Sequence, residues 1–172
     1  MSNINDLLIY IGKYGYLFLA LIVFLEYLNL PGLPAGIIMP AAGIVVKADG
    51  LNFTYTLIIS VIAGLLGSFI LYAIGHYFGK PILDKWEKKF PKSKKAIDKT
   101  FKYIDKYGNA GILISRLIPV ARTLISLVAG TFNVNFIKFA LYSTIGITIW
   151  NFGFIYAGYA FSHLFLKWIT KK

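Results

Sequence analysis

The sequence has no cysteine among its 172 residues, which excludes disulfide bonds, thiolate metal sites and thiol catalysis. It also lacks any low-complexity tract or linker rich in serine, glycine and proline. We therefore expect residues 1–172 to form one domain. The N-terminal segment MSNINDLLIY has no basic n-region, so we expect it to remain in the mature protein rather than to be removed as a secretory signal.

Charged residues are scarce, at 15% of the chain against 58% hydrophobic residues. Soluble domains are about a quarter charged and about half apolar, so this composition predicts an integral membrane protein. The net charge of +11 does not indicate nucleic-acid binding, because ten lysines and four acids fall between residues 80 and 106. Such an excess marks the cytoplasmic face of a membrane, and the aromatic residues among the lysines predict an amphipathic basic loop on the headgroups.

Two apolar stretches, from Asn52 to Gly79 and from Val134 to about Ala160, are long enough to cross a bilayer. Two others, from Leu28 to Gly43 and from Ser115 to Gly130, are broken by proline and cannot run as single helices. Their arms are shorter than the hydrocarbon core, which is about 30 Å thick. We expect each broken stretch to form a re-entrant hairpin that enters and leaves the membrane on the same side.

The chain repeats itself weakly, and the repeat predicts the fold. The pattern YI-x-KYG at residues 10–15 recurs at 103–108, and Asn-Phe, Ser and Gly recur 83 residues apart at 52–53 and 135–136, 60 and 143, and 75 and 158. We therefore predict an all-α integral membrane protein built as an inverted repeat of two re-entrant helical hairpins, each followed by a long transmembrane helix. Repeat 1 covers about 10–79, repeat 2 about 103–160, and residues 161–172 form an interfacial tail.

Arginine is almost absent, and this makes its placement informative. There are sixteen lysines but only two arginines, Arg116 and Arg122, and both lie in the apolar segment ISRLIPVARTLISLVAG. A charge near the bilayer centre costs about 2.5 to 3.5 kcal/mol on insertion scales, so such residues usually face a partner or a ligand. Arginine holds phosphate bidentately, and a break at Pro119 could aim both side chains at one point. The alternatives are snorkelling to headgroups and pairing with a buried acid.

Glu26 is the one glutamate outside the basic loop. As a buried carboxylate it could carry a proton, or it could neutralise either arginine; an acid in contact with interfacial water is the third alternative. Ser115 and Thr123 adjoin the arginines, but no histidine is near them in sequence, so we expect no enzyme activity. His76 and His163 are isolated, and we expect neither a metal site nor another cofactor.

Small residues in the long stretches indicate close helix packing, with Gly75 and Gly79 forming one pair and Ala63 and Gly67 another. Lys47 and Asp49 adjoin Gly50, which is typical of a solvated turn.

The segment YGNAGILISRLIPVARTLISLVAGTFNVNFIKFALYSTIGITIW resembles the diagnostic half of the DedA family. The matching residues are Arg116, Ile118, Pro119, Arg122, Thr123, Ala129, Gly130, Gly146 and Trp150. The first half, from Glu26 through Pro34 to Gly43, is similar to the acidic residue and Pro-Gly hairpin of that family. Three departures stand out: Ala35 follows Pro34 without the second acid, Ile112 replaces an aromatic residue, and a further C-terminal hydrophobic helix is shortened or missing.

The resemblance implies a lipid transporter or flippase of the bacterial cytoplasmic membrane. Its substrate would be a phosphate-bearing lipid, with undecaprenyl phosphate favoured and phosphatidylethanolamine or another phospholipid next. Whether transport is coupled to ions or protons is left undecided. The implied substrate-binding residues are Glu26, Pro34, Ser115, Arg116, Pro119, Arg122 and Thr123, with Glu26 alone left to carry protons. The alternative function is a non-transporting scaffold anchored to lipid headgroups, and a lipid-phosphate enzyme is a weaker alternative. The sequence leaves undecided whether the protein forms a homo-oligomer.

The topology can be tested directly, because the natural chain has no cysteine to give background labelling. With the basic loop in the cytoplasm and both termini outside, a cysteine replacing Ser93 should react with an impermeant maleimide only after cells are opened. Labelling of that cysteine in intact cells would contradict the predicted topology.

Overall fold

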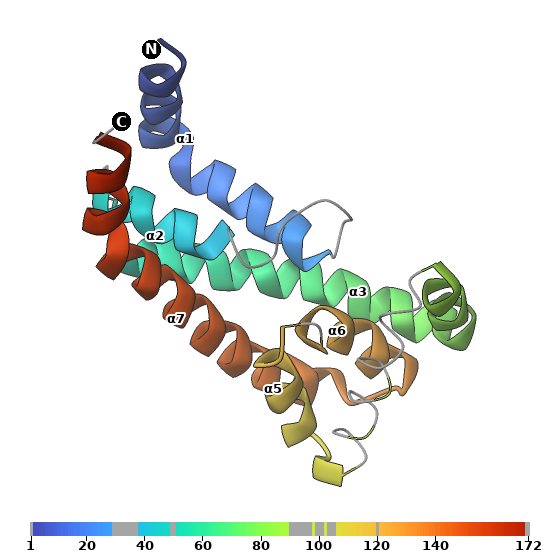
Figure 1. Cartoon of the computed structure of the whole chain (residues 1–172). Helices are drawn as coiled ribbons and strands as arrows, with labels where there is room; N and C mark the ends of the chain where they lie inside the picture. Colours follow the sequence, from blue (N-terminus) through green and yellow to red (C-terminus); the bar gives the residue numbers. More distant parts are fainter. Residues whose placement is uncertain are drawn as a thin grey trace.

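The computed structural model describes residues 2–28, 38–48, 51–89, 106–119 and 121–170, together with residues 98 and 102. All regular structure in these ranges is helical (Figure 1). The helices are α1 (Ser2–Tyr27), α2 (Ile38–Ala48), α3 (Phe53–Lys89), α5 (Ala110–Arg116), α6 (Ala121–Thr131) and α7 (Phe136–Thr170). The expectation of an all-helical chain is confirmed.

Two helices are long and apolar enough to cross a membrane, over Phe53–Gly79 and Phe136–Ser162. Helix α3 is interrupted at Gly79, whose φ of 48° and ψ of −137° lie outside the helical region, and Pro81 follows. A positive φ suits glycine because it has no Cβ. The apolar part of α3 therefore ends at Gly79, and the last turns take a new direction towards the exposed Lys88 and Lys89 (Figure 1).

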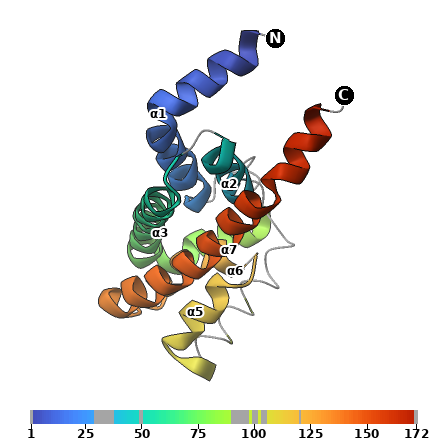
Figure 2. The ribbon, with the colours of Figure 1, turned by 90° about the vertical axis from the view of Figure 1, so that its left-hand side faces the viewer.

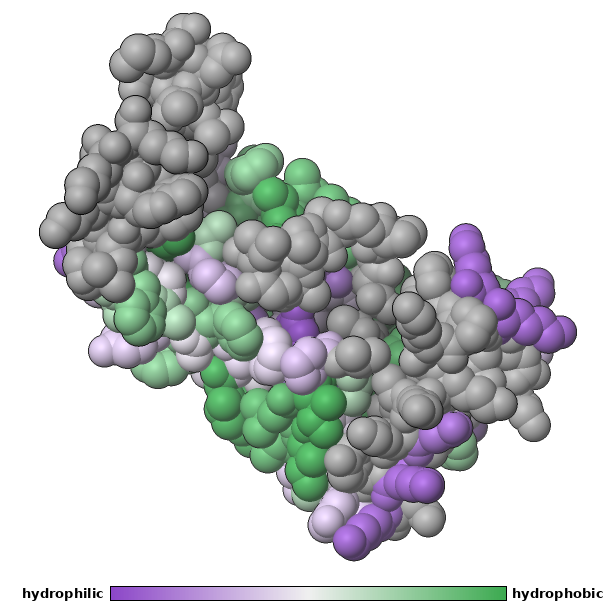
Figure 3. Space-filling model, viewed as in Figure 1, coloured by the Kyte–Doolittle hydropathy of each residue, from purple (hydrophilic) through white to green (hydrophobic). Residues whose placement is uncertain are grey.

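The outward faces of the long helices are apolar. On α3 the exposed residues Ile58, Ile62, Leu66 and Ile70 recur every four positions and so form one stripe. On α7 the corresponding residues are Leu141, Ile145, Ile149, Phe152 and Tyr156. Figure 3 shows groups of hydrophobic side chains on the visible face and the most hydrophilic ones at its right and lower right. Surface patches of this extent call for an apolar surrounding, which a bilayer provides.

The repeated Asn-Phe pairs cap the two long helices. The Asn52 Oδ1 atom accepts a hydrogen bond from the Tyr55 N–H at 3.1 Å, and the Asn135 Oδ1 atom accepts one from the Lys138 N–H at 3.1 Å. Each asparagine thus satisfies a backbone donor that the first helical turn leaves unpaired. Both helices begin directly after their cap, which gives this part of the sequence repeat a structural reason.

Helix α6 ends in a Schellman motif that turns the chain into α7. Asn133 has a φ of 54°, the Val134 N–H bonds the Ala129 carbonyl at 3.0 Å and the Asn133 N–H bonds the Gly130 carbonyl at 3.0 Å. Asparagine is among the few residues other than glycine that tolerate this left-handed position. Because the turn is tight, α6 lies close to the start of α7.

The short helices pack on the long ones: α2 lies against α7 and α6 against α3 (Figures 1 and 2). Glycines make both crossings close. A Cβ on Gly43 would lie 2.0 Å from the Ile155 carbonyl oxygen, and one on Gly130 would lie 2.0 Å from that of Tyr72. Reciprocal contacts come from the long helices, where a Cβ on Gly158 would lie 2.0 Å from the Pro40 oxygen and one on Gly75 would lie 2.1 Å from the Leu127 oxygen.

These contacts recur at fixed separations along the chain. On the short helices 87 residues separate Gly43 from Gly130 and Pro40 from Leu127; on the long helices 83 residues separate Gly75 from Gly158 and Tyr72 from Ile155. The close-packing role predicted for Gly75 is therefore observed, whereas Gly79 has no atom near its Cβ position and acts in the kink instead. The Ala63 and Gly67 face packs on α1, where a Cβ on Gly67 would lie 2.8 Å from the Phe24 oxygen.

The apolar part of α1, Tyr14–Tyr27, and helix α2 have 14 and 11 residues. At 1.5 Å per residue they span about 21 and 17 Å, less than a hydrocarbon core of about 30 Å. The second proline-broken stretch is interrupted as expected, since α5 ends at Arg116 and α6 starts at Ala121. The segment 29–37 that joins α1 to α2 lies outside the described residues, as does most of the basic loop. The predicted tail continues α7 as helix to Thr170.

The glycine crossings generate a stability test. Replacing Gly130 by alanine should force α6 away from α3, because the new Cβ would meet backbone atoms that cannot rotate aside. We expect a loss of stability of at least the 1 to 3 kcal/mol typical of overpacked sites, measured as thermal unfolding in detergent micelles. The matched control is Gly153→Ala on the exposed face of α7, where nothing lies within 4 Å. It should be neutral or stabilising, and equal melting of the two variants would contradict the packing argument.

Candidate functional site

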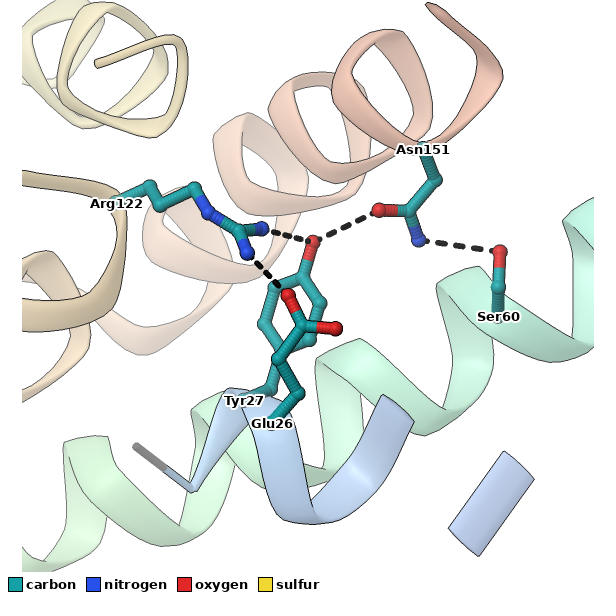
Figure 4. Close-up of polar contacts among 5 residues, drawn as sticks. All are labelled: Glu26, Tyr27, Ser60, Arg122 and Asn151. Carbon is teal, nitrogen blue, oxygen red and sulfur yellow. Dashed lines mark hydrogen bonds and ion pairs between the residues drawn. The ribbon is translucent and has the colours of Figure 1, made fainter. Parts of the chain in front are cut away.

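A buried ion pair joins the two proline-broken halves of the chain (Figure 4). The Arg122 Nη2 atom, at the start of α6, donates to Glu26 Oε1, near the end of α1. Both residues are about 3% exposed. Of the roles considered for Glu26, the structure therefore places it beside an arginine and away from water. A buried carboxylate and a buried guanidinium stabilise each other, because an unpaired charge in the interior would carry a large desolvation cost.

Tyr27 extends this pair into a chain of hydrogen bonds across four helices. Its hydroxyl accepts a bond from Arg122 Nη1 at 3.2 Å and donates one to Asn151 Oδ1 at 3.0 Å. The Asn151 amide in turn donates to the Ser60 hydroxyl at 3.1 Å. Figure 4 shows the chain running from α6 through the end of α1 to α7 and α3. Polar groups that would be costly in an apolar interior are thus satisfied by one another.

Arg116 lies at the end of α5 and is 2% exposed. Its Nη2 atom donates to the hydroxyls of Ser126 at 3.1 Å and Ser143 at 2.9 Å. Among the described residues, its Nε and Nη1 atoms have no hydrogen-bond partner, and no carboxylate pairs with it. Arg116 is consequently a buried cation whose Nε and Nη1 groups could still donate hydrogen bonds to a ligand.

Aromatic rings lie close to both guanidinium groups. The Arg122 Cζ atom lies 4.7 Å from the ring centre of Trp150 and 5.2 Å from that of Tyr27. The Arg116 Cζ atom lies 5.6 Å from the ring centre of Phe139. Cation–π contacts of this kind are stronger when they are shielded from water. Each guanidinium group thus has an aromatic ring as well as hydrogen-bond partners.

The structure brings together part of the predicted residue set. Ser115 is fully buried beside Arg116, and its hydroxyl has no partner within the described part of the chain. Pro119 lies exposed in the bend between α5 and α6. Thr123 belongs to α6, but its side chain is outside the described part, and Pro34 lies outside it altogether.

Sequence reasoning did not assign a site role to Tyr27, Ser126, Ser143, Asn151 or Trp150, all of which contact an arginine or its partners. One signal was available for Asn151, since an amide in the apolar run ITIWNFGFI needs a buried hydrogen-bond partner. No comparable signal marks the serines, which also occur in membrane helices without a ligand.

An apolar cavity of about 270 Å³ lies between α1, α2 and the start of α3. Its lining includes Phe18, Ile22, Ile38 and Val45, and Thr56 is the one residue with a polar side chain among those that line it. The Thr56 hydroxyl is bonded to the Asn52 carbonyl at 3.1 Å. Because its described lining has no charged group, the cavity suits a hydrocarbon chain better than a phosphate.

Comparisons with known proteins agree with the resemblance seen in the sequence. The VTT domain model matches residues 30–160. The chain is 31% identical to undecaprenyl phosphate transporter A of Bacillus subtilis over 91% of this chain and 77% of that protein, and 36% identical to undecaprenyl phosphate transporter A of Staphylococcus aureus over 91% and 78%. It is 30% identical to protein DedA of Escherichia coli over 92% and 74%. No solved structure matches the chain.

The first two names describe transporters, in agreement with the expectation that this protein is not an enzyme. The family match covers most of the chain, and the similarity extends over most of each relative's length. The protein therefore belongs to the VTT domain family of membrane proteins, the family of DedA.

Proposed function

We propose that this protein carries a phosphate-bearing lipid across the bacterial cytoplasmic membrane, and that Arg116 and Arg122 bind its phosphate. The observation that carries the proposal is the state of Arg116, a buried guanidinium with two unpartnered nitrogen atoms and no carboxylate among the described residues. An anion with several acceptor oxygens would neutralise this charge and occupy these donors.

The charges around the site favour an anionic ligand. Two guanidinium groups face one described carboxylate, Glu26, so the cluster keeps one positive charge. The two arginines are near neighbours in the chain, across the bend at Pro119. A phosphate dianion bound by both would leave Glu26 without its partner. Glu26 would then be neutral only with a proton, which gives a physical basis for coupling transport to protons.

The lipid we favour is undecaprenyl phosphate, followed by phosphatidylethanolamine or another phospholipid. Two relatives at 31% and 36% identity carry the name undecaprenyl phosphate transporter A. The apolar cavity along α1 and α2 offers room for part of a hydrocarbon chain while the phosphate lies at the arginines. Pro34, Ser115, Pro119 and Thr123 complete the proposed binding segments.

We further propose that the chain is an inverted repeat with re-entrant hairpins and that the two halves meet at the phosphate site. The crossings of α2 on α7 and of α6 on α3, made by residues at matched separations, support this architecture. The shortness of α2 and α6 supports it as well. Transporters of this type place broken helices near the membrane centre, where helix N-termini favour anionic groups.

The roles of the arginines can be tested by replacing each with lysine. Lysine keeps the charge but loses the planar fork, so Arg116→Lys and Arg122→Lys should each slow lipid transport at least tenfold. The measurement is flipping of a fluorescent polyprenyl phosphate, or of a dithionite-reducible phospholipid, in proteoliposomes with and without a pH gradient. Lys138→Gln, which removes an exposed charge from α7, should transport normally.

Full transport by both lysine variants would remove the case for a bidentate phosphate site. A natural protein that flips neither lipid under any pH gradient would favour a scaffold that only anchors to headgroups.

Glu26 has a separate test, because removing its charge leaves Arg122 unpaired. Breaking a buried ion pair costs about 3 to 5 kcal/mol in soluble interiors, so Glu26→Gln should melt at a lower temperature in micelles. The double variant Glu26→Gln with Arg122→Gln should recover part of that loss. If Glu26 carries the proton, Glu26→Gln should also abolish the dependence of transport on the pH gradient. Normal transport without pH dependence in both the natural protein and Glu26→Gln would exclude Glu26 as the proton carrier.

A further inference from the structure

Trp150 has a buried donor that no residue of the described part of the chain accepts. Its indole Nε1 atom is shielded from solvent and has no hydrogen-bond partner in the ranges that the structure describes. An indole N–H can only donate, so neither a second donor nor an apolar neighbour can satisfy it. Buried polar groups are nearly always paired, and an exception calls for an explanation.

The position of Trp150 is fixed by its neighbours. Its ring lies 4.7 Å from the Arg122 Cζ atom, and it packs on Phe154 with ring centres 4.6 Å apart. Asn151, the next residue on α7, belongs to the hydrogen-bond chain that begins at Arg122 (Figure 4). The unused N–H therefore belongs to a ring held against the binding site.

Trp150 also shares a helix face with the contacts of Arg116. Gly146 precedes it by one turn, and a Cβ on Gly146 would lie 2.7 Å from the Arg116 Cβ. Ser143, one turn earlier, accepts a hydrogen bond from Arg116. Residues three or four apart lie on one side of a helix, so Ser143, Gly146 and Trp150 form a single stripe along α7.

Unpartnered donors thus gather around the two arginines. They are the Nε and Nη1 atoms of Arg116, the hydroxyl of Ser115 and the indole N–H of Trp150. A phosphate monoester has three terminal oxygens to accept from such a set, whereas a diester such as phosphatidylethanolamine has two. The number of unused donors therefore suits the monoester better.

We propose that Trp150 is a phosphate-contacting residue that donates its indole N–H to a terminal oxygen of the lipid phosphate and favours monoesters over diesters. The inference rests on the function proposed above, since it assumes that the phosphate lies at the arginines. It adds a phosphate-contacting residue on α7 to the two arginines, Arg116 and Arg122, that the proposed function already assigns.

The test is Trp150→Phe, which keeps an aromatic ring beside Arg122 but deletes the donor. We expect the dissociation constant for farnesyl phosphate, titrated into the full chain in nanodiscs, to rise at least fivefold. Because an unsatisfied donor is removed, the melting temperature of the ligand-free variant should be unchanged or higher. A residue with only a structural role would instead lower the melting temperature and leave the affinity of the folded protein unchanged.

Two further ligands separate the headgroup from the lipid. Inorganic phosphate tests the anion alone and should also bind more weakly to Trp150→Phe. Binding of phosphatidylethanolamine vesicles should change less than that of farnesyl phosphate. An equal loss for monoester and diester would overturn the proposed selectivity.

A second measurement needs no change at Trp150. In a protein with Trp86 and Trp168 replaced by phenylalanine, the indole ¹⁵N–¹H resonance of Trp150 should move downfield with farnesyl phosphate. Arg116→Lys should weaken this response. If the resonance stays still while the ligand binds in an Arg116-dependent manner, the role of Trp150 is overturned and the phosphate site stands. If the natural protein does not bind farnesyl phosphate at all, the proposed function fails first.

Discussion

The structure depends on keeping two guanidinium groups inside an apolar interior. Arg116 and Arg122 are about 2% and 3% exposed, and a cation at that depth is costly without partners. Each described helix except α2 contributes to meeting that cost. Helix α1 supplies Glu26 and Tyr27, and α6 supplies Ser126. Helix α7 supplies Ser143 and the rings of Phe139 and Trp150. Helix α5 carries Arg116 itself, and α3 ends the hydrogen-bond chain at Ser60.

That concentration of partners requires the helix backbones to approach closely, and glycine makes the approach feasible. At Gly43, Gly75, Gly130 and Gly158 a Cβ would come within about 2 Å of a carbonyl oxygen on the facing helix. In lipid, where no hydrophobic effect drives helices together, close packing between small residues is a main source of association. The glycines that cross the helices thus support the position of the arginines, although none of the four contacts an arginine in the described structure.

The sequence predicted those features that depend on local chemistry or on composition. Span lengths, the break at Pro119 and the burial of both arginines follow from apolar runs and scarce charges, and the recurring Asn52 and Asn135 are explained by helix capping. The pairing of Glu26 with Arg122 was one of several alternatives, because partners 96 residues apart are set by tertiary packing. For the same reason Tyr27, Asn151 and Trp150 were not assigned to the site: each gains its role only when α1, α6 and α7 meet.

The two arginines look equivalent in the sequence, but their surroundings differ in a way that bears on mechanism. Arg122 has a carboxylate, a tyrosine hydroxyl and two rings, so its charge is already compensated. Arg116 has two serine hydroxyls and one ring, so its charge is not. On the proposed function, an arriving anion would gain most at Arg116, because binding there would displace no partner among the described residues, whereas binding at Arg122 would compete with Glu26. Capture at Arg116 would therefore come first, and recruitment of Arg122 would require the contact between α1 and α6 to open. On the proposed function, the ion pair that joins Glu26 to Arg122 would then be the contact that the ligand has to break.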